Sequence, residues 1–273
     1  MHVSSSMRVA VAATTAAAAG AFLLGSNKQR SSLRNPDEEV SCRRLGLMTP
    51  TDAQRTEVVA LRKFLTRAEV AALKADIAAL GGSIGRIERS ERGAPAFIGP
   101  WVTTYLHTSH ILAERFGPLR RRLVDAAAAA DAAHWGVLGD GAGVNVRTCE
   151  CHRYGPGGAL SADRHYDAGS LITMGLMLSS PGEDFEGGGF VTPEADGTVA
   201  RHTYDEGDLL LFVSHKYHNV EPVTEGARTV LITELWRGPE KTCAHRCLIL
   251  GDCDYTIERA RLAALAQQAM FLG

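Results

Sequence analysis

One short segment of the sequence carries a histidine and a carboxylate at a spacing suited to holding a metal ion. The segment Arg164-His165-Tyr166-Asp167 contains the pattern His-x-Asp. In an extended chain, side chains two positions apart point to the same side. His165 and Asp167 can therefore offer one imidazole nitrogen and one carboxylate oxygen to the same ion.

A third ligand is required, and two histidines further along the chain are candidates. His215 and His218 lie three positions apart, just after the apolar run Leu209–Val213. Two histidines and one carboxylate on one face of an octahedron leave three positions open. That arrangement is typical of non-haem Fe(II) oxygenases.

A single arginine follows this histidine pair at the start of another apolar run. Arg228 comes ten positions after His218 and directly before Thr229–Trp236. A guanidinium at the head of a strand in an apolar barrel is costly unless it meets an anion. Its planar fork suits a carboxylate, so an organic dianion could bind the metal at one end and Arg228 at the other.

The first half of the chain must support these residues with helices. Glu57–Leu65 is apolar enough for a strand, and Thr66-Arg67-Ala68-Glu69 predicts a capping box. We expect a helix from about Arg67 to Leu80, ended by two glycines. A second helical region is expected from Thr104 to Ala133, broken near Gly117-Pro118.

The second half reads as a series of short strands. Val144–Tyr154 alternates so that its even-numbered residues face one way. Further strands are expected at Leu171–Leu178, Gly189–Thr192, Leu209–Val213 and Thr229–Trp236, with glycine-rich turns between them. Short strands with regular turns favour a jelly roll. The predicted fold class is therefore α+β: a double-stranded β-helix (jelly-roll) barrel with N-terminal supporting helices.

From Arg153 to Trp236, and more loosely from Val58, the chain resembles the Fe(II)- and 2-oxoglutarate-dependent dioxygenases, in particular their prolyl 4-hydroxylase-like branch. The family's distal motif has a histidine, a Pro-Val pair and then Gly-x-Arg or Gly-x-Lys. His218, Pro222-Val223 and Gly226-Ala227-Arg228 match that motif. The spacing to Arg228 favours His218 over His215.

The resemblance implies roles for particular residues. His165, Asp167 and His218 would hold Fe(II), and Arg228 would bind the distal carboxylate of 2-oxoglutarate. Tyr154 and Thr173 would assist around the co-substrate, and Trp236 is a weaker candidate for the pocket wall.

The implied reaction consumes O2, converts 2-oxoglutarate to succinate and CO2, and hydroxylates a C–H bond. Ascorbate would keep the iron reduced. The implied partner is a peptide or protein with a prolyl residue to be hydroxylated.

One departure from the family bears on the substrate. Collagen-type prolyl hydroxylases usually carry Lys where this chain has Arg228, and the chain has no room for their separate peptide-binding domain. A small molecule or another side chain is the alternative substrate. Two other classes also remain: a cupin-like metal enzyme that does not use 2-oxoglutarate, and an inactive barrel that only binds a ligand.

The sequence divides into three parts. Residues 1–45 form a leader and linker, 46–240 the dioxygenase domain with a jelly-roll core at about 144–237, and 241–273 a cysteine-bearing tail and helix. The uncharged run Val9–Leu24 can be a signal-anchor, a signal peptide or a transit peptide. We expect entry to the secretory pathway, in the ER or Golgi, with membrane attachment as an option; the alternative is an organelle.

The composition of the chain also bears on which binding partners are expected. The formal net charge is −2, so there is no general electrostatic attraction to nucleic acid, and none is expected as a partner. The 45% hydrophobic content is that of a globular protein. The six cysteines are expected as disulfides or free thiols rather than a zinc site. The sequence does not fix the oligomeric state.

Overall fold

The computed structural model describes residues 36–80, 86–89, 97–98, 101–162 and 164–242. The apolar run at residues 9–24, the tail at 243–273 and its three cysteines lie outside that part of the chain. The three-part division of the chain therefore stays a prediction. Across the described ranges, no helix combines the length and the apolar character needed to cross a membrane.

Helices come mainly from the first half of the chain. They are α1 (Pro36–Arg44), α2 (Pro50–Ala53), α3 (Arg67–Ala79), a 3-10 helix (Thr108–His110), α4 (Ile111–Arg115) and α5 (Gly117–His134). The first of them falls within the segment assigned to the leader and linker, and its Cys42 is buried in the hydrophobic core. Cys42 thus packs in the same core cluster as residues of α3 and α5.

Strands make up most of the remainder. They are β1 (Val59–Leu61), β2 (Arg86–Arg89), β3 (Phe97–Ile98), β4 (Trp101–Tyr105), β5 (Val144–Tyr154), β6 (Ala159–Leu160), β7 (Ile172–Met177), β8 (Phe185–Gly187), β9 (Phe190–Pro193), β10 (Val199–His202), β11 (Leu209–Val213), β12 (Asn219–Val220), β13 (Val223–Gly226) and β14 (Arg228–Arg237).

The strands pair into a large and a small antiparallel sheet plus a two-stranded ribbon. The large sheet has the order β1-β11-β7-β14-β5-β4-β2, and the small sheet has the order β10-β9-β12-β6-β3. β13 and β8 form the ribbon. This is the predicted jelly-roll class, with one refinement: between the described strands, no hydrogen-bonded pair joins the two sheets into a closed barrel.

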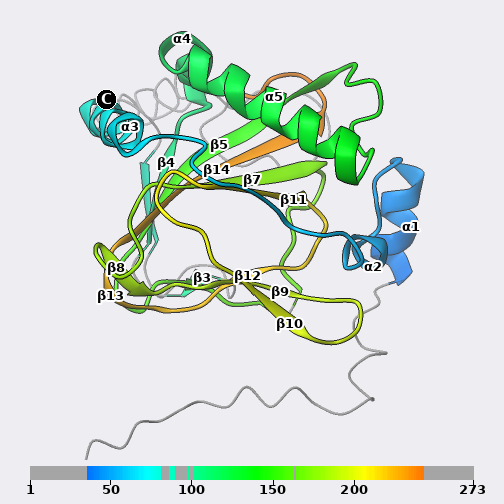
Figure 1. Cartoon of the computed structure of the whole chain (residues 1–273). Coiled ribbons are helices and arrows are strands. Elements are labelled where there is room, and N and C mark those ends of the chain that lie inside the picture. Colours follow the sequence, from blue (N-terminus) through cyan, green and yellow to red (C-terminus); the bar gives the residue numbers. More distant parts are fainter. Residues whose placement is uncertain (1–35, 81–85, 90–96, 99–100, 163, 243–273) are drawn as a thin grey trace, which may run out of the picture. The chain divides into compact units, whose positions relative to one another are not determined.

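Alternation along the strands separates two apolar layers. Leu210 and Phe212 of β11 face the small sheet, where they pack in one cluster with Phe190 and Val220. Leu209 and its odd-numbered neighbours face the other way and pack with residues of α3 and α5. Figure 1 shows α5 lying across the large sheet. The helices therefore cover the outer face and leave the inner face to the site.

The predicted strands at 144–154, 171–178, 189–192, 209–213 and 229–236 are confirmed within two residues at their ends. The predicted helix from Thr104 is wrong at its start. Residues 101–105 form β4, in which Trp101, Thr103 and Tyr105 are buried and the residues between them are half-buried. Pairing with β5 on one side and β2 on the other decides this conformation, which local helix propensity does not reveal.

The capping box that begins α3 is also confirmed. The Thr66 hydroxyl accepts from the Glu69 backbone N–H at 3.2 Å, and the Glu69 carboxylate accepts from the Thr66 N–H at 2.7 Å. The Arg122 guanidinium of α5 donates to the same carboxylate at 2.6 Å. The Thr66 backbone bond, followed by the bond from Arg122, lowers the pKa of Glu69 to about 2.

This lowered pKa gives a prediction for acid stability. Because the folded state holds Glu69 ionised, the carboxylate stabilises the fold above its ordinary pKa of 4.5, and that contribution is lost as the pH falls toward about 2. Glu69→Ala should therefore lower the free energy of unfolding at pH 7. The difference in this free energy between the variant and wild type, the gap, should become smaller below about pH 4.5. Urea unfolding at several pH values measures this, and a gap that stays constant down to pH 3 would contradict the assignment.

Candidate active site

The His-x-Asp segment lies in the loop that connects β6 to β7. The Asp167 N–H donates to the Ser214 carbonyl at 2.9 Å, which ties the loop to the end of β11. The Asp167 carbonyl in turn accepts from the Ser170 N–H at 3.2 Å, so residues 167–170 form a β-turn that begins at the carboxylate. His165 is partly exposed, whereas Asp167 is buried.

His218 reaches the same place from the loop after β11. Its backbone N–H donates to the His165 carbonyl at 3.0 Å, so the two loops are joined by main chain. Its Nδ1 lies 3.0 Å from the Lys216 carbonyl and must be the donor, because a carbonyl only accepts. That tautomer leaves the lone pair of Nε2 available for a metal ion.

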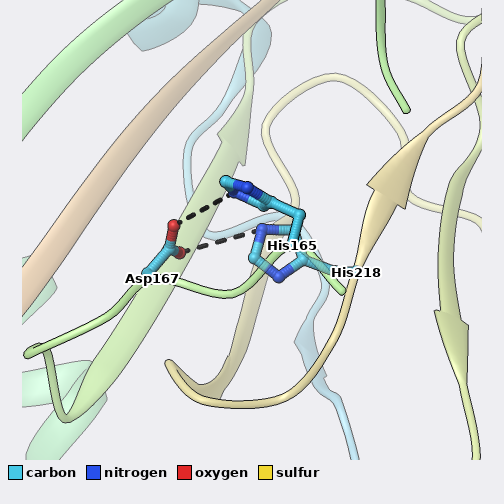
Figure 2. A group of neighbouring side chains, drawn as sticks. All are labelled: His165, Asp167 and His218. Atoms are coloured by element: carbon cyan, nitrogen blue, oxygen red, sulfur yellow. Dashed lines mark ion pairs between the residues drawn. The ribbon is translucent and has the colours of Figure 1, made fainter. Parts of the chain in front are cut away.

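The three predicted ligands converge, as Figure 2 shows. His165 Nε2 lies 3.5 Å from Asp167 Oδ1, and His218 Nε2 lies 3.8 Å from Asp167 Oδ2. One ligand atom from each residue falls within 4.8 Å of the others. Two imidazole nitrogens and one carboxylate oxygen at these separations can hold a divalent ion on one face of its coordination octahedron.

His215 lies outside this group. Its Nδ1 donates to the Met48 carbonyl at 2.7 Å, and its Nε2 accepts from the Gly169 N–H at 3.2 Å. Both ring nitrogens are therefore engaged by the backbone. Burial lowers the pKa of His215 and keeps the ring neutral. His215, the alternative third ligand, therefore joins backbone segments and does not belong to the group of His165, Asp167 and His218.

The neighbouring Lys216 is a fully buried cation. Its ammonium donates to the carbonyls of Gln54 and Thr56 at 3.3 Å and 2.8 Å. It also forms a 2.7 Å ion pair with Glu194. Lys216 therefore links the segment around α2, the β9–β10 hairpin and the loop that carries His218.

Thr173 contacts one of the three predicted ligands, Asp167, directly. Its hydroxyl donates to Asp167 Oδ2 at 2.7 Å and lies 2.9 Å from the Ser214 hydroxyl. The sequence predicts Thr173 as a helper around the co-substrate. The structure places it on the carboxylate of Asp167, where it orients that side chain while still lining the same cavity.

Arg228 begins β14 and lies in the same cavity as the metal group. It is 1% exposed, and its Nη2 donates to the Tyr204 hydroxyl at 2.6 Å. Its Nε and Nη1 are buried without a hydrogen-bond partner. Gly188 packs against it so closely that a Cβ there would come within 2.8 Å of Arg228 Cδ. Any larger residue at position 188 would therefore clash with the Arg228 side chain.

Tyr154 and Tyr204 flank the guanidinium. The Arg228 Cζ lies 5.5 Å from the Tyr154 ring centre and 5.8 Å from that of Tyr204. Burial raises the pKa of both phenols, although Arg228 opposes the shift. Both therefore remain neutral hydroxyls near neutral pH, able to donate to an anion placed beside Arg228.

Several further residues line the cavity. Trp101 donates its Nε1–H to His152 Nδ1 at 2.8 Å, and His152 Nε2 lies 3.2 Å from Glu150. All three line the cavity. The alternation of Val144–Tyr154 places residues 150, 152 and 154 on one face, so that signal was present. No local motif indicates Trp101 or Tyr204.

Trp236 does not line the cavity. It is fully buried, donates to the Pro239 carbonyl at 3.0 Å, and its ring lies 5.5 Å from the Arg147 guanidinium.

Among the described residues, Cys42, Cys149 and Cys151 are buried thiols. Burial raises the pKa of Cys149 and of Cys151 to about 12, so neither acts as a nucleophile at neutral pH.

No protein-family model matches the chain. A PKHD-type hydroxylase of Idiomarina loihiensis is 43% identical over 61 residues, which is 22% of this chain and 26% of that protein. A PKHD-type hydroxylase of Aliarcobacter butzleri is 34% identical over 91 residues, 33% of this chain and 38% of that protein. The chain thus spans well under half the length of the curated relatives it matches.

Solved structures share the fold. A prolyl-4-hydroxylase of Pseudomonas putida superposes with a TM-score of 0.50 at 20% identity, covering 70% of this chain and 98% of that one. A Trichoplax adhaerens prolyl hydroxylase, in complex with a hypoxia-inducible-factor peptide fragment, gives 0.51 at 16% identity, covering 77% and 96%. The chain has the jelly-roll fold of the Fe(II)- and 2-oxoglutarate-dependent oxygenases, and its resemblance to their prolyl 4-hydroxylase-like branch is confirmed.

Proposed function

We propose that the protein is an Fe(II)- and 2-oxoglutarate-dependent dioxygenase that hydroxylates a C–H bond. One observation carries the proposal: a buried arginine with two unpartnered donors shares a cavity with a two-histidine, one-carboxylate group. The similarity to PKHD-type hydroxylases supports the same class of reaction.

The three ligand residues fit Fe(II). The His218 tautomer is set by the Lys216 carbonyl, and the Asp167 carboxylate is oriented by the Thr173 hydroxyl. Such supporting bonds are typical of metal sites, because they fix both the ring orientation and the ionised state of each ligand. His165, Asp167 and His218 would hold the ion and leave positions open for small ligands.

Arg228 fits the distal carboxylate of 2-oxoglutarate. A buried guanidinium with Nε and Nη1 unpartnered has a large desolvation cost, which a carboxylate placed beside it would offset. Tyr204 holds the third nitrogen, so the fork is fixed before the co-substrate arrives. A cupin-like enzyme that did not use a dianionic co-substrate would have no use for this charge.

Bound Fe(II) would supply the oxidation of 2-oxoglutarate by O2 to succinate and CO2, coupled to substrate hydroxylation, with ascorbate as the reductant that maintains the ferrous state. The chain's own part is to place these groups and keep water away. The His218 ring lies against Phe190 and Phe212, with ring centres 5.6 Å and 4.9 Å away. These two apolar rings, one from each sheet, shield the His218 ring from water.

The substrate we propose is a prolyl residue of a peptide or protein. This part of the proposal is supported by the prolyl hydroxylase neighbours, one of which holds a peptide fragment. A small molecule or another side chain is the alternative.

Succinate formation from 2-oxoglutarate, with Fe(II) and ascorbate, tests both parts of the proposal. We expect slow turnover alone and faster turnover with a proline-rich peptide, together with a mass gain of one oxygen in the peptide. A poly-alanine peptide of equal length is the control. Succinate without peptide stimulation would keep the oxygenase and exclude the prolyl substrate. Iron binding without any succinate would overturn the oxygenase.

A further inference from the structure

A buried polar cluster lies beneath the loop that carries Asp167. Arg147 and Glu234 are each 1% exposed in their side chains, with Arg147 Nη1 3.5 Å from Glu234 Oε2. The Ser170 hydroxyl connects them: it accepts from Arg147 Nη1 at 2.8 Å and donates to Glu234 Oε2 at 2.6 Å. We call these three residues the turn-anchoring cluster.

A β-bulge brings Arg147 into this cluster. β14 and β5 pair Glu234 with Thr148 and then Leu235 with Val146, so Arg147 is the extra residue on β5. A bulge re-aims the side chain of its extra residue and is found preferentially next to active sites. Here the re-aimed guanidinium reaches the loop before β7.

The cluster holds the second and the last residue of the turn that starts at Asp167. Arg147 donates to the Ala168 carbonyl as well as to the Ser170 hydroxyl. Between them, Gly169 has a φ of +83°, the value that position i+2 of a type II turn requires. Its Cα faces the guanidinium, since a Cβ built there would lie 3.5 Å from Arg147 Nη1.

A buried ion pair is a weak source of stability, because desolvation of two charges offsets most of their attraction. This pair is instead bonded to the turn that sets the position of the Asp167 carboxylate. Thr173, directly opposite Glu234 in the sheet, donates to that same carboxylate. The cluster and the carboxylate are thus adjacent parts of one hydrogen-bonded unit.

We infer that Arg147, Ser170 and Glu234 are positioning residues for the metal centre, acting through the 167–170 turn on the carboxylate of Asp167. This inference rests on the proposed function, because it assumes that Asp167 is a metal ligand. Loss of groups that support a ligand typically lowers metal affinity by about 10- to 100-fold.

Ser170→Ala is the sharpest test, because it cuts the link between the ion pair and the turn without removing a charge. Co(II) titration of the metal-free full-length protein, followed by visible absorption, should show a dissociation constant raised about 10-fold. Ser180→Ala is the matched control: Ser180 is also buried and donates to a glutamate, Glu206, at 3.0 Å, in a different loop. It should bind Co(II) like wild type.

Two further measurements separate positioning from general stability. Thermal unfolding of the metal-free proteins should show similar losses for both serine variants, with the affinity change confined to Ser170→Ala. Glu234→Gln, which keeps the shape but removes the charge, should also weaken Co(II) binding and shift the absorption bands. Wild-type affinity and spectrum in both variants would overturn the inference. Wild-type protein that bound no Co(II) would overturn the metal centre itself, and this inference with it.

Discussion

Asp167→Ala is expected to abolish Fe(II)-dependent succinate formation while the protein remains folded. The carboxylate is the only charged member of the three-residue ligand group, so its loss removes both a ligand atom and the charge that balances the ion. Divalent metal affinity should fall by more than about 100-fold, the upper effect of losing a group that merely supports a ligand. Titration with Co(II) and a succinate assay at saturating iron measure the two effects.

Asp131→Ala provides a control for the loss of a buried aspartate. Asp131 is also 3% exposed, but it lies in α5, where its carboxylate accepts from the backbone N–H groups of Val137 and Leu138 at 2.8 Å. Its removal should cost about 1–3 kcal/mol of stability and leave Co(II) affinity unchanged. Full activity of Asp167→Ala, or equal loss of metal in both variants, would refute the assigned ligand.

Arg228→Ala should raise the 2-oxoglutarate requirement steeply. Two hydrogen bonds to a charged partner are each worth about 1.5–3 kcal/mol, which together correspond to about 10²- to 10⁴-fold in affinity. The 2-oxoglutarate affinity of Arg228→Lys should lie between those of wild type and Arg228→Ala, because lysine keeps the charge but loses the planar fork. The metal-free, co-substrate-free Arg228→Ala protein should be no less stable than wild type, because the orphaned buried guanidinium is gone.

A co-substrate analogue without the distal carboxylate shows whether Arg228 acts on that group. Wild type should prefer 2-oxoglutarate over 2-oxopentanoate, which lacks that carboxylate, and Arg228→Ala should lose most of the preference. Tyr204→Phe, which removes only the hydroxyl that holds Nη2, should retain the preference with weaker binding. An unchanged apparent affinity in Arg228→Ala would refute its role, whatever the effect on turnover.

The parts of the fold that the sequence predicts are those encoded locally. α3 has its capping box, and β5 and β14 have long apolar or alternating runs, so each is visible in its own segment. The short strands β12 and β10 have no such pattern and exist because a neighbour pairs with them. The helix predicted from Thr104 overlaps the end of β4, a strand that likewise depends on pairing with its neighbours β2 and β5.

The residues of the site also differ in whether a local sequence pattern reveals them. His165, Asp167, His218 and Arg228 stand in recognisable spacings, and the structure brings all four to one cavity. Tyr204 lies in an unremarkable segment between β10 and β11, and only the folded chain shows that it holds Arg228. Thr173 is predicted near the co-substrate and lines that cavity, but its hydrogen bond to the Asp167 carboxylate is seen only in the folded chain. Contacts made across sheets and loops do not leave a local sequence signal.

The burial of Lys216 has a consequence for how the molecule opens. Its ammonium is fully buried and bonded to Glu194 and to the carbonyls of Gln54 and Thr56, so the segment around α2 cannot detach alone without removing two of the hydrogen-bond acceptors of this ammonium. Segments that cannot open separately exchange their amide hydrogens together, as one cooperative unit. The segment around α2 is therefore expected to open and exchange together with the loop that carries His218.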